Sequence, residues 1–367
     1  MTSSPRRIII LGVTGTVGQR ALQILNDDTV DWQLIAVSSH TGTLDTQALP
    51  FSAKHCFKTS NPDDKHALLD LLRGGDYDIC LNAIVGAAGL PYSEAVIASG
   101  KNLALANKES LVMAGSLLLP LAAKSNAKII PVDSEHSAIF QCLNGDDTSV
   151  RKLFLTASGG ALRDTPLEQL ASTTPAQALD HPNWDMGPRI TIDSATMMNK
   201  AFELIEAHWL FGVSSEQMQV LIHRQSVIHS MVEFVDGSVL AQLGPPDMGF
   251  PLHYALHYPA RSQSNLQGFD PTLYANLSLE QPDPQRYPAL RLADAVISHG
   301  GTAGAVLNAA DEEAVAAFLD GRIQFNDIAP LCDDALASCS SKLATTMDDI
   351  FEADQRTRDH CNHAIKN

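Results

Sequence analysis

The sequence has few basic residues and no long apolar run. Of its 367 residues, 25 are Lys or Arg and 42 are Asp or Glu, which gives a formal net charge of −17. This sign argues against nucleic acid or an anionic membrane surface as a partner, because both are negatively charged. The longest apolar runs, such as Leu117 to Ala123, fall well short of the roughly 20 residues that a membrane-spanning helix needs. An anionic substrate must therefore be held by a few local donors.

Paired cysteines and a targeting segment are also missing. The six cysteines include no Cys-x-x-Cys pair, so we expect reduced thiols, no disulfide and no zinc site. The N-terminus passes through Arg6 and Arg7 directly into an apolar stretch, which leaves no room for a signal or transit peptide. We therefore expect a cytoplasmic protein.

The apolar pattern predicts an α/β fold at the start of the chain. A length of 367 residues with 45% hydrophobic residues suggests two or three globular domains. From residue 8 to residue 132, short apolar runs alternate with helical periodicity, as in a doubly wound, Rossmann-like parallel sheet. The pattern predicts strands over 7–11, 33–37, 78–84, 102–106 and 128–132, and helices over 16–26, 64–73, 90–99 and 110–124.

A glycine-rich turn follows the first predicted strand. Gly12, Gly15 and Gly18 lie between that strand and the next helix, where backbone N–H groups can bind a pyrophosphate. The spacing predicts a dinucleotide site, and an ordinary tight turn is the alternative. The second strand ends in the segment 37–42, which has no carboxylate to repel a 2′-phosphate and no Arg or Lys to bind one. We favour NADP(H).

Two carboxylates follow the last strand predicted in this part. Asp133 and Glu135 are two residues apart, and in extended backbone their side chains would point to the same side. Like charges this close disfavour joint ionisation unless a cation lies between them, which indicates a divalent metal. The alternative is that Asp133 or Ser134 simply caps the following helix.

Small residues and a polar helix face indicate an anion site further along. Ser158 begins a turn with two glycines, so its hydroxyl and nearby amides could bind an anion. A helix is predicted from Ser194 to about Phe211. Ser194, Asn199 and Lys200 offer the donors that an anion needs, beside a carboxylate that could complete the metal site. The alternative is a solvated surface face with a Lys200–Glu203 pair. The residues spaced to share that face are Thr196, Asn199, Lys200 and Glu203.

A loop over residues 181–188 contains two prolines, Gly187 and the large apolar side chains Trp184 and Met186. Exposed apolar residues on a glycine-bounded loop are typical of a mobile lid. The alternative is a loop whose aromatic side chain fills a gap in the core.

The remaining sequence predicts a second sheet and a helical end. Residues 220–243 alternate like antiparallel strands, with a turn at Asp236 and Gly237. Residues 244–288 are rich in proline and predict an irregular linker, and helices are predicted over 289–299, 302–319 and 327–338. The expected parts are a Rossmann-like NADPH-binding domain (1–132), a catalytic metal- and substrate-binding α+β domain with the lid (133–258), a linker (259–288) and a C-terminal helical domain (289–367).

Eight motifs carry a resemblance to one family. They occur in the family's order over nearly the whole chain, at residues 11–18, 83–90, 105–111, 131–141, 156–160, 181–184, 193–200 and 225–231. On these motifs the chain resembles the 1-deoxy-D-xylulose 5-phosphate reductoisomerases. The resemblance implies an NADPH- and metal-dependent homodimeric enzyme of non-mevalonate isoprenoid biosynthesis. Such an enzyme rearranges its sugar-phosphate substrate and reduces the resulting aldehyde to 2-C-methyl-D-erythritol 4-phosphate.

The resemblance also assigns roles by position. Oxygen ligands suit Mg²⁺ or Mn²⁺, and the implied metal ligands are Asp133, Glu135 and Glu203. The implied catalytic set adds Lys108 and His181. The implied cofactor contacts are Thr14, Gly15, Thr16, Val17, His40, Asn107, Glu109 and Gly187. The implied substrate contacts are Lys108, Ser134, Glu135, Ser158, His181, Ser194, Asn199, Lys200 and Glu203, with Trp184 and Met186 on the lid.

The chain departs from the family's usual pattern at several positions. The family usually has Asn where this chain has Asp311, and Arg where it has Gly249, and the cofactor segment 39–42 is unusual. A degenerate homologue that binds NADP(H) or a sugar phosphate without turnover is the alternative, but no carboxylate ligand is missing. An aldehyde dehydrogenase resembling aspartate-semialdehyde dehydrogenase would need a nucleophilic Cys, and residues 143–331 contain none.

Overall fold

The computed structural model describes residues 4–42, 52–145, 148–184, 186–339 and 342–366. The chain forms two compact units, and each unit gathers segments that are distant in sequence. The first unit comprises Met1–Ser110, Leu118–Ser137 and Asp247–Gly268, and the second comprises Leu111–Leu117, Ala138–Pro246 and Phe269–Asn367.

A six-stranded parallel sheet forms the core of the first unit, in the order β3-β2-β1-β4-β5-β6. Its strands are β1 (Arg6–Leu11), β2 (Trp32–Ser39), β3 (His55–Lys58), β4 (Ile79–Asn82), β5 (Asn102–Leu105) and β6 (Ile129–Pro131). The central strand β1 carries Ile8, Ile9 and Ile10, which are fully buried, as expected for a strand covered on both faces. The strand order reverses between β1 and β4, and ligands of such sheets bind at the carboxyl ends of the strands there.

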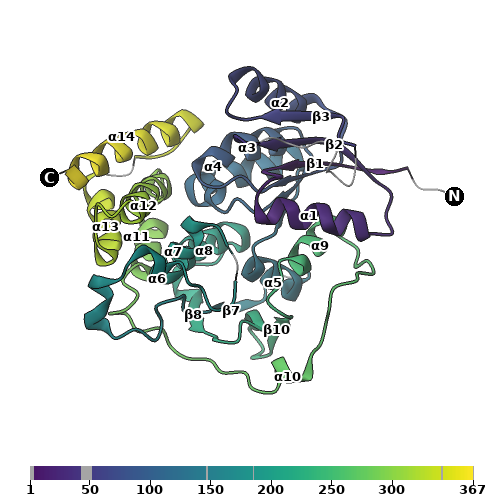
Figure 1. Cartoon of the computed structure of the whole chain (residues 1–367). Coiled ribbons are helices and arrows are strands. Elements are labelled where there is room, and N and C mark those ends of the chain that lie inside the picture. The colour runs from purple at the N-terminus through teal and green to yellow at the C-terminus, as the bar shows by residue number, and fades with distance from the viewer. Residues whose placement is uncertain (1–3, 43–51, 146–147, 185, 340–341, 367) are drawn as a thin grey trace. The chain divides into compact units, whose positions relative to one another are not determined.

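Helices cover this sheet. They are α1 (Thr16–Asp27), α2 (Pro62–Gly74), α3 (Leu90–Ala98) and α9 (Gly249–His257), with α4 (Glu109–Ser125) and α5 (Ser134–Leu143) contributing to both units. Asn61 caps α2 by accepting the N–H groups of Asp63 and Asp64. Figure 1 shows the purple helix α1 beside the green helix α9, although more than 220 residues separate them in sequence, and the two pack together.

The strand and helix predictions for this unit are confirmed to within a few residues. Strand β3 was missed because its side chains are mostly exposed and give no apolar run. The prediction of irregular chain over 244–288 is wrong at α9. Pro251 lies in the first turn of that helix, where its missing N–H removes no intrahelical hydrogen bond.

The second unit contains a mixed four-stranded sheet in the order β10-β9-β7-β8. Its strands are β7 (Val150–Ala157), β8 (Met218–Ile222), β9 (Ile228–Phe234) and β10 (Val239–Leu243). Strand β8 pairs parallel with β7, and the other pairs are antiparallel. The predicted turn at Asp236 and Gly237 is confirmed, with Gly237 at a φ of 85°. Strand β10 forms one edge of the sheet, and Val239 and Leu240 on it are half exposed.

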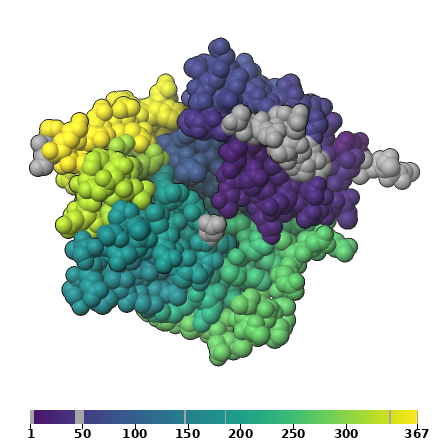
Figure 2. Space-filling model, viewed as in Figure 1, coloured from purple at the N-terminus to yellow at the C-terminus, as the bar shows by residue number. Residues whose placement is uncertain are grey.

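The other helices of this unit are α6 (Pro175–Ala178), α7 (Pro188–Thr196), α8 (Met198–Phe211), α10 (Pro271–Tyr274), α11 (Leu290–His299), α12 (Ala303–Leu319), α13 (Ile328–Ser338) and α14 (Met347–Lys366). Alanines on the buried helix α12 let neighbouring helices approach closely. Figure 2 shows α13 and α14, in yellow-green and yellow, forming one continuous surface. No helix in the described parts of the chain is long and apolar enough to cross a membrane.

The single helix predicted from Ser194 to Phe211 is wrong. Met197 adopts a φ of 64°, which ends α7 at Thr196 and starts α8 at Met198. The Oγ1 of Thr196 accepts the N–H of Met198 at 3.2 Å, so the break between the helices has its own hydrogen bond. Thr196 therefore does not share a helix face with Asn199, Lys200 and Glu203.

A buried polar contact between Asp28 and His257 fastens α9 to the end of α1. Asp28 Oδ2 lies 2.6 Å from His257 Nε2 and accepts the indole N–H of Trp32 at 2.7 Å. The side chains of Asp28 and His257 are 0% and 3% exposed. Burial raises the pKa of Asp28, but its hydrogen bonds to Trp32 and Val30 and the nearby His257 hold that pKa below its usual range.

We expect Asp28→Asn to lower the free energy of unfolding by about 3 kcal/mol at neutral pH, because it removes the buried charge and replaces one of the two acceptor oxygens by an NH₂ donor. A carboxyl whose pKa is lowered by folding contributes stability above its unfolded pKa and loses it as pH falls through the folded pKa. The loss caused by the substitution should therefore shrink below about pH 4. Urea unfolding of both proteins from neutral pH to below about pH 4 measures this loss, with Asp31→Asn, at an exposed position, as control. Equal losses in both variants would contradict the prediction.

Candidate active site

Asp133 and Glu135 lie where β6 leads into α5. Asp133 immediately precedes α5, and Glu135 lies in the first turn of that helix. The prediction of extended backbone is thus wrong at Glu135, yet the helical turn still brings an oxygen of each carboxylate within 4.8 Å. Asp133 Oδ1 also accepts the N–H of Ser134 at 3.0 Å. This bond reaches only the N–H of the next residue and occupies one of the two carboxylate oxygens, so it does not by itself exclude a metal-ligand role.

A buried lysine compensates the charge of Asp133. Lys108, just before α4, forms an ion pair with Asp133 Oδ2, and their side chains are 8% and 14% exposed. Burial raises the pKa of Asp133, but the Lys108 ammonium and His136 outweigh it and hold that pKa well below its usual range. Asp133 is therefore ionised at neutral pH, as a metal ligand must be. Ser134 Oγ donates to Glu135 Oε2 at 2.6 Å, so this predicted substrate contact orients the second carboxylate.

The glycine turn after β1 has the geometry of a dinucleotide site. Gly12 has a φ of 76°, and a Cβ there would lie 2.6 Å from the Ala83 carbonyl oxygen. A Cβ on Gly18 would lie 2.4 Å from the Gly12 carbonyl oxygen, so α1 packs against the turn only because glycine is present. Gly15 is the N-cap residue of α1 and supplies no capping side chain. The first-turn N–H groups can therefore face an anion.

Four other predicted cofactor residues follow β1 or β2 in the first unit: Thr14, Thr16, Val17 and His40. Thr14 and Thr16 are exposed, and Val17 is half-buried. The exposed His40 follows β2, and its Nδ1 lies 3.2 Å from Thr59 Oγ1. In the second unit, Gly187 is the N-cap residue of α7.

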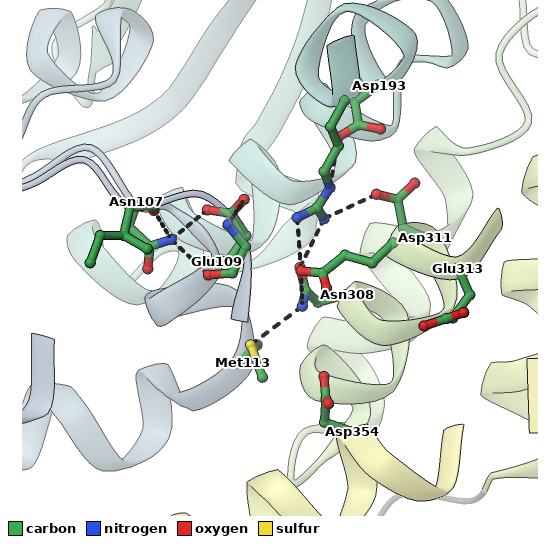
Figure 3. A network of polar contacts seen from close by, with 12 residues as sticks. Asn107, Glu109, Met113, Asp193, Asn308, Asp311, Glu313 and Asp354 are labelled. Atoms are coloured by element: carbon green, nitrogen blue, oxygen red, sulfur yellow. Dashed lines mark hydrogen bonds and ion pairs between the residues drawn. The ribbon is translucent and has the colours of Figure 1, made fainter. Parts of the chain in front are cut away.

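Asn107 and Glu109 hold the loop after β4. Asn107 is almost fully buried, and its Nδ2 donates to the carbonyl oxygens of Ile84 and Gly86 and to Glu109 Oε2 (Figure 3). Glu109 Oε1 accepts the N–H of Gly86 at 3.0 Å. Both residues thus fix the backbone beside the glycine turn, since Ala83 on the same segment contacts Gly12.

Ser158 and Ser194 lie on adjacent segments of the second unit. Ser158 follows β7, and its Oγ accepts the N–H of Gly160 at 3.2 Å. Gly159 and Gly160 have φ values of 87° and 73°. A Cβ on Gly160 would lie 2.5 Å from the carbonyl oxygen of Ser194, so the turn lies directly against α7. The turn that begins at Ser158 and the helix end that carries Ser194 are therefore in backbone contact.

His181 joins Ser158 to the loop before α7. Its Nδ1 accepts the N–H groups of Asn183 and Trp184 at 3.2 Å and 3.0 Å, and its Nε2 lies 3.0 Å from Ser158 Oγ. This pattern requires the tautomer with its proton on Nε2. Burial and the positive charge of Arg163 lower the pKa of His181 to about 4. His181 is a neutral hydrogen-bonding group at physiological pH.

The predicted polar helix face is buried rather than solvated. Lys200 and Glu203 are 3% and 1% exposed and form an ion pair one turn apart on α8. Asn199 Nδ2 also donates to Glu203 Oε1. The solvation alternative is therefore wrong for Lys200 and Glu203. A buried lysine and amide beside a buried carboxylate could serve both an anion and a cation.

The loop predicted as a lid is partly tied to the second unit. Asn183 Nδ2 donates to the Arg224 carbonyl oxygen at 2.8 Å and to Ser226 Oγ at 2.9 Å. Trp184 and Met186 are half-buried, and residue 185 lies outside the described residues.

Arg163 is a site residue that sequence reasoning missed. Its Nη1 donates to the Ser158 carbonyl oxygen at 2.8 Å, which places a cation beside the predicted anion-binding turn. Its position five residues after Ser158 is the only sequence signal, and a lone arginine at that spacing is not specific.

Comparison with protein families gives one consistent result. The family described as 1-deoxy-D-xylulose 5-phosphate reductoisomerase matches residues 52–115, and its C-terminal domain family matches residues 129–211. The family described as DXP reductoisomerase C-terminal domain matches residues 243–360.

Individual relatives agree with the family matches. The 1-deoxy-D-xylulose 5-phosphate reductoisomerase of Pseudomonas aeruginosa is 43% identical to this chain, and the match covers 97% of each of the two sequences. The enzyme of Xanthomonas euvesicatoria is 44% identical, and the match covers 99% of this chain and 98% of the relative.

Solved structures of the same enzyme also match. The Zymomonas mobilis enzyme in complex with NADPH is 39% identical, with a TM-score of 0.91 over 99% of this chain and 100% of that one. A DOX-P reductoisomerase in complex with NADPH, fosmidomycin and magnesium is 37% identical, with a TM-score of 0.93 over 98% of each chain.

We expect nuclear magnetic resonance of the imidazole nitrogens to show His181 neutral, with its proton on Nε2, from about pH 5 to pH 8. Arg163→Met should raise the pKa of His181 because it removes the nearby like charge while the burial remains. The distant Arg291→Met serves as control and should leave that pKa unchanged. Titration of His181 near the ordinary histidine value in the unsubstituted protein would contradict the prediction.

Proposed function

The chain belongs to the 1-deoxy-D-xylulose 5-phosphate reductoisomerase family, and on that basis we propose that it converts this substrate to 2-C-methyl-D-erythritol 4-phosphate in non-mevalonate isoprenoid biosynthesis. The reaction is an isomerisation followed by reduction with NADPH, and it uses Mg²⁺ or Mn²⁺. The observation that carries the proposal is that every implied metal ligand is present. Two of them, Asp133 and Glu203, each have a lysine partner.

Asp133, Glu135 and Glu203 would hold the divalent ion. The donor set fits, since all three groups offer carboxylate oxygens, which Mg²⁺ and Mn²⁺ prefer. The bound ion would supply Lewis-acid polarisation of substrate oxygens. Lys108 beside Asp133, together with Ser134, would orient the substrate hydroxyl groups and keep the carboxylate charges balanced.

The phosphate would be bound by Ser158, Ser194, Asn199 and Lys200. Support comes from the contact between the Ser158 turn and α7 at Ser194. Lys200 supplies positive charge from a buried position. Neutral His181, with its proton on Nε2, would donate a hydrogen bond to a substrate hydroxyl without adding charge. These local donors can bind a dianion even though the chain as a whole is acidic.

NADPH would supply the hydride from a site built on the glycine turn. Gly15, Thr16 and Val17 at the start of α1, together with Thr14, would contact the pyrophosphate, because the first-turn N–H groups meet no capping side chain there. His40 would lie toward the adenosine end, since it follows β2. Asn107 and Glu109 would support the cofactor through the loop they fix, and Gly187 would contact it at the start of α7.

The four-part division at residues 132, 258 and 288 is part of the proposal, as are a homodimer and a cytoplasmic location. The exposed apolar side chains of edge strand β10 support self-association, because an unpaired edge favours pairing with a second copy. Analytical ultracentrifugation tests this. The six cysteines, all in the described part of the chain, form no disulfide, which is typical of a reducing compartment.

The deciding experiment mixes purified protein with 1-deoxy-D-xylulose 5-phosphate, Mg²⁺ and NADPH, and follows the loss of nicotinamide absorbance. We expect a loss that requires substrate and stops when the metal is chelated. Binding of NADPH and substrate without this loss would instead support the degenerate homologue.

Asp133→Asn, Glu135→Gln and Glu203→Gln should each lower kcat/KM by more than about 100-fold, the upper end for residues that only support metal ligands. Each removes one ligand charge, so higher Mg²⁺ concentrations should recover part of the loss. Asp236→Asn, an exposed carboxylate in a turn, is the matched control. Metal-dependent turnover retained in all three variants would rule out this ligand set.

If the tryptophan closes over the substrate, Trp184→Ala should lower kcat/KM, because water could reach reactive fragments in the variant. The loss corresponds to about 2–4 kcal/mol of transition-state stabilisation. Trp184→Phe should keep most of the activity, and substrate should protect residues 180–190 from proteolysis. If Trp184→Ala lowers only thermal stability, and the loop resists protease without substrate, the tryptophan fills a gap in the core instead.

A further inference from the structure

One guanidinium joins the first turn of α7 to α12. Arg189 Nη1 donates to Glu312 Oε1 at 2.9 Å. Its Nη2 donates to Asn308 Oδ1 at 2.9 Å and to Asp311 Oδ2 at 3.1 Å, and Figure 3 labels these two acceptors. The three acceptors are spaced i, i+3 and i+4, so they share one face of α12. The fixed fork of a guanidinium suits several acceptors at once, which a lysine could not match.

Arg189 also contacts its own helix and the next one. Its Nε lies 3.6 Å from Asp193 Oδ2, one turn further along α7. Its guanidinium carbon lies 5.8 Å from the centre of the Phe202 ring on α8. A single side chain thus contacts α7, α8 and α12.

The cluster around Arg189 is buried and strongly charged. The side chains of Arg189, Asp193 and Asp311 are 16%, 6% and 0% exposed. Replacing such buried ion clusters by apolar residues is often neutral or stabilising. Stability alone therefore does not explain this cluster. A function that requires α7, α8 and α12 to keep one fixed arrangement does explain it.

The groups facing Asp311 come from every helix around it. They are Arg189 and Asp193 on α7, Glu312 on α12 and the buried Cys332 on α13, with Arg358 on α14 bound to the far side of Glu312 at 2.6 Å. Burial raises the pKa of Asp311 to about 6 although the charge of Arg189 opposes this. Glu312 raises that pKa further, and hydrogen bonds from Arg189 and with Asp193 lower it.

Helix α7 carries proposed site residues at both ends. Gly187 and the Trp184 loop lead into its first turn, and Ser194 lies in its last turn against Gly160. The helix has nine residues, so it is only two to three turns long. A displacement at Arg189 would therefore be transmitted to Ser194 with little loss.

We propose that Arg189, held by Asn308 and Asp311, is a positioning residue for phosphate binding. It fixes α7 on α12 and thereby places the Ser194 hydroxyl against the Ser158 turn. The inference rests on the proposed function, because the phosphate role of these serines belongs to it. Arg189 acts through Ser194 and does not itself need to touch the phosphate.

The test uses Arg189→Met in the full chain, with inorganic phosphate as the probe in isothermal titration calorimetry. We expect phosphate binding to weaken at least about 10-fold, since a misplacement near 1 Å can cost up to about 100-fold. The KM for the sugar phosphate should rise in parallel, while kcat changes less and the dissociation constant of NADPH stays within about twofold.

The matched control is Arg291→Met, which removes an exposed arginine paired with Asp333 in the same unit. It should leave phosphate binding unchanged. If Arg189→Met binds phosphate as tightly as the unsubstituted protein and only its melting temperature falls, the arginine is merely structural and the inference is wrong. If the unsubstituted protein does not bind phosphate, the proposed phosphate site is wrong and the inference falls with it.

Two substitutions of Asp311 test the same inference without removing the arginine. Asp311→Asn keeps an acceptor for Arg189 and should bind phosphate within about twofold of the unsubstituted protein. Asp311→Leu has a similar size but no acceptor, and it should weaken phosphate binding as Arg189→Met does. Equal phosphate affinity in the Asn and Leu variants would overturn the proposal.

A stability measurement shows whether Asp311→Asn acts as intended. A carboxyl whose pKa is raised by folding contributes stability below its unfolded pKa and loses it as pH rises through the folded pKa. The Asn side chain does not titrate, so the Asp311→Asn variant does not lose stability in this way as pH rises. Its melting temperature relative to the unsubstituted protein should therefore be higher at about pH 8 than at about pH 5. A difference independent of pH would overturn the assignment of Asp311 as a buried acceptor of Arg189.

Discussion

A buried carboxylate is stable in a protein only if a cation or several donors compensate its charge. Each unit has one implied metal ligand with a largely buried side chain, and a lysine compensates its charge in both cases. Lys108 pairs with Asp133 in the first unit, and Lys200 pairs with Glu203 in the second. This requirement determines much of the local structure, because each lysine must itself be positioned by a helix. Lys108 immediately precedes α4, and Lys200 and Glu203 are one turn apart on α8.

Much of the fold follows from residue patterns because burial on both faces requires continuous apolar strands. The runs around Ile8 to Ile10 and Leu103 to Leu105 identify central strands without any other information. The pattern failed where tertiary contacts decide the structure. The largely exposed β3 has no apolar run, and α9 is a helix that proline content concealed. Its attachment depends on Asp28, which is more than 200 residues away and gives no signal in the local sequence.

Candidate site residues stand out in the sequence where a residue type has few uses in that context, and they do not stand out where it has many. Paired carboxylates after a buried strand, and glycines in a strand-to-helix turn, are specific enough to indicate chemistry. The local backbone was harder to predict, since Glu135 faces Asp133 from a helical turn and Met197 breaks the helix that was expected to continue. Arginines are common on surfaces, so neither Arg163 nor Arg189 stood out, although both prove to be partly buried and bound to the site's backbone or helices.

The acidic character of the chain explains why positioning matters so much for its proposed anionic substrate. A net charge of −17 gives an approaching phosphate no long-range attraction. Affinity must therefore come from short-range hydrogen bonds, which weaken steeply when donors are misplaced. Such donors lie on short elements, the Ser158 turn and the two-to-three-turn helix α7, and neither is rigid alone. Gly160 allows the turn to approach α7, and Arg189 fastens α7 to α12. The buried charge cluster around Arg189 thus positions the hydrogen-bond donors on which a substrate site with few cations depends.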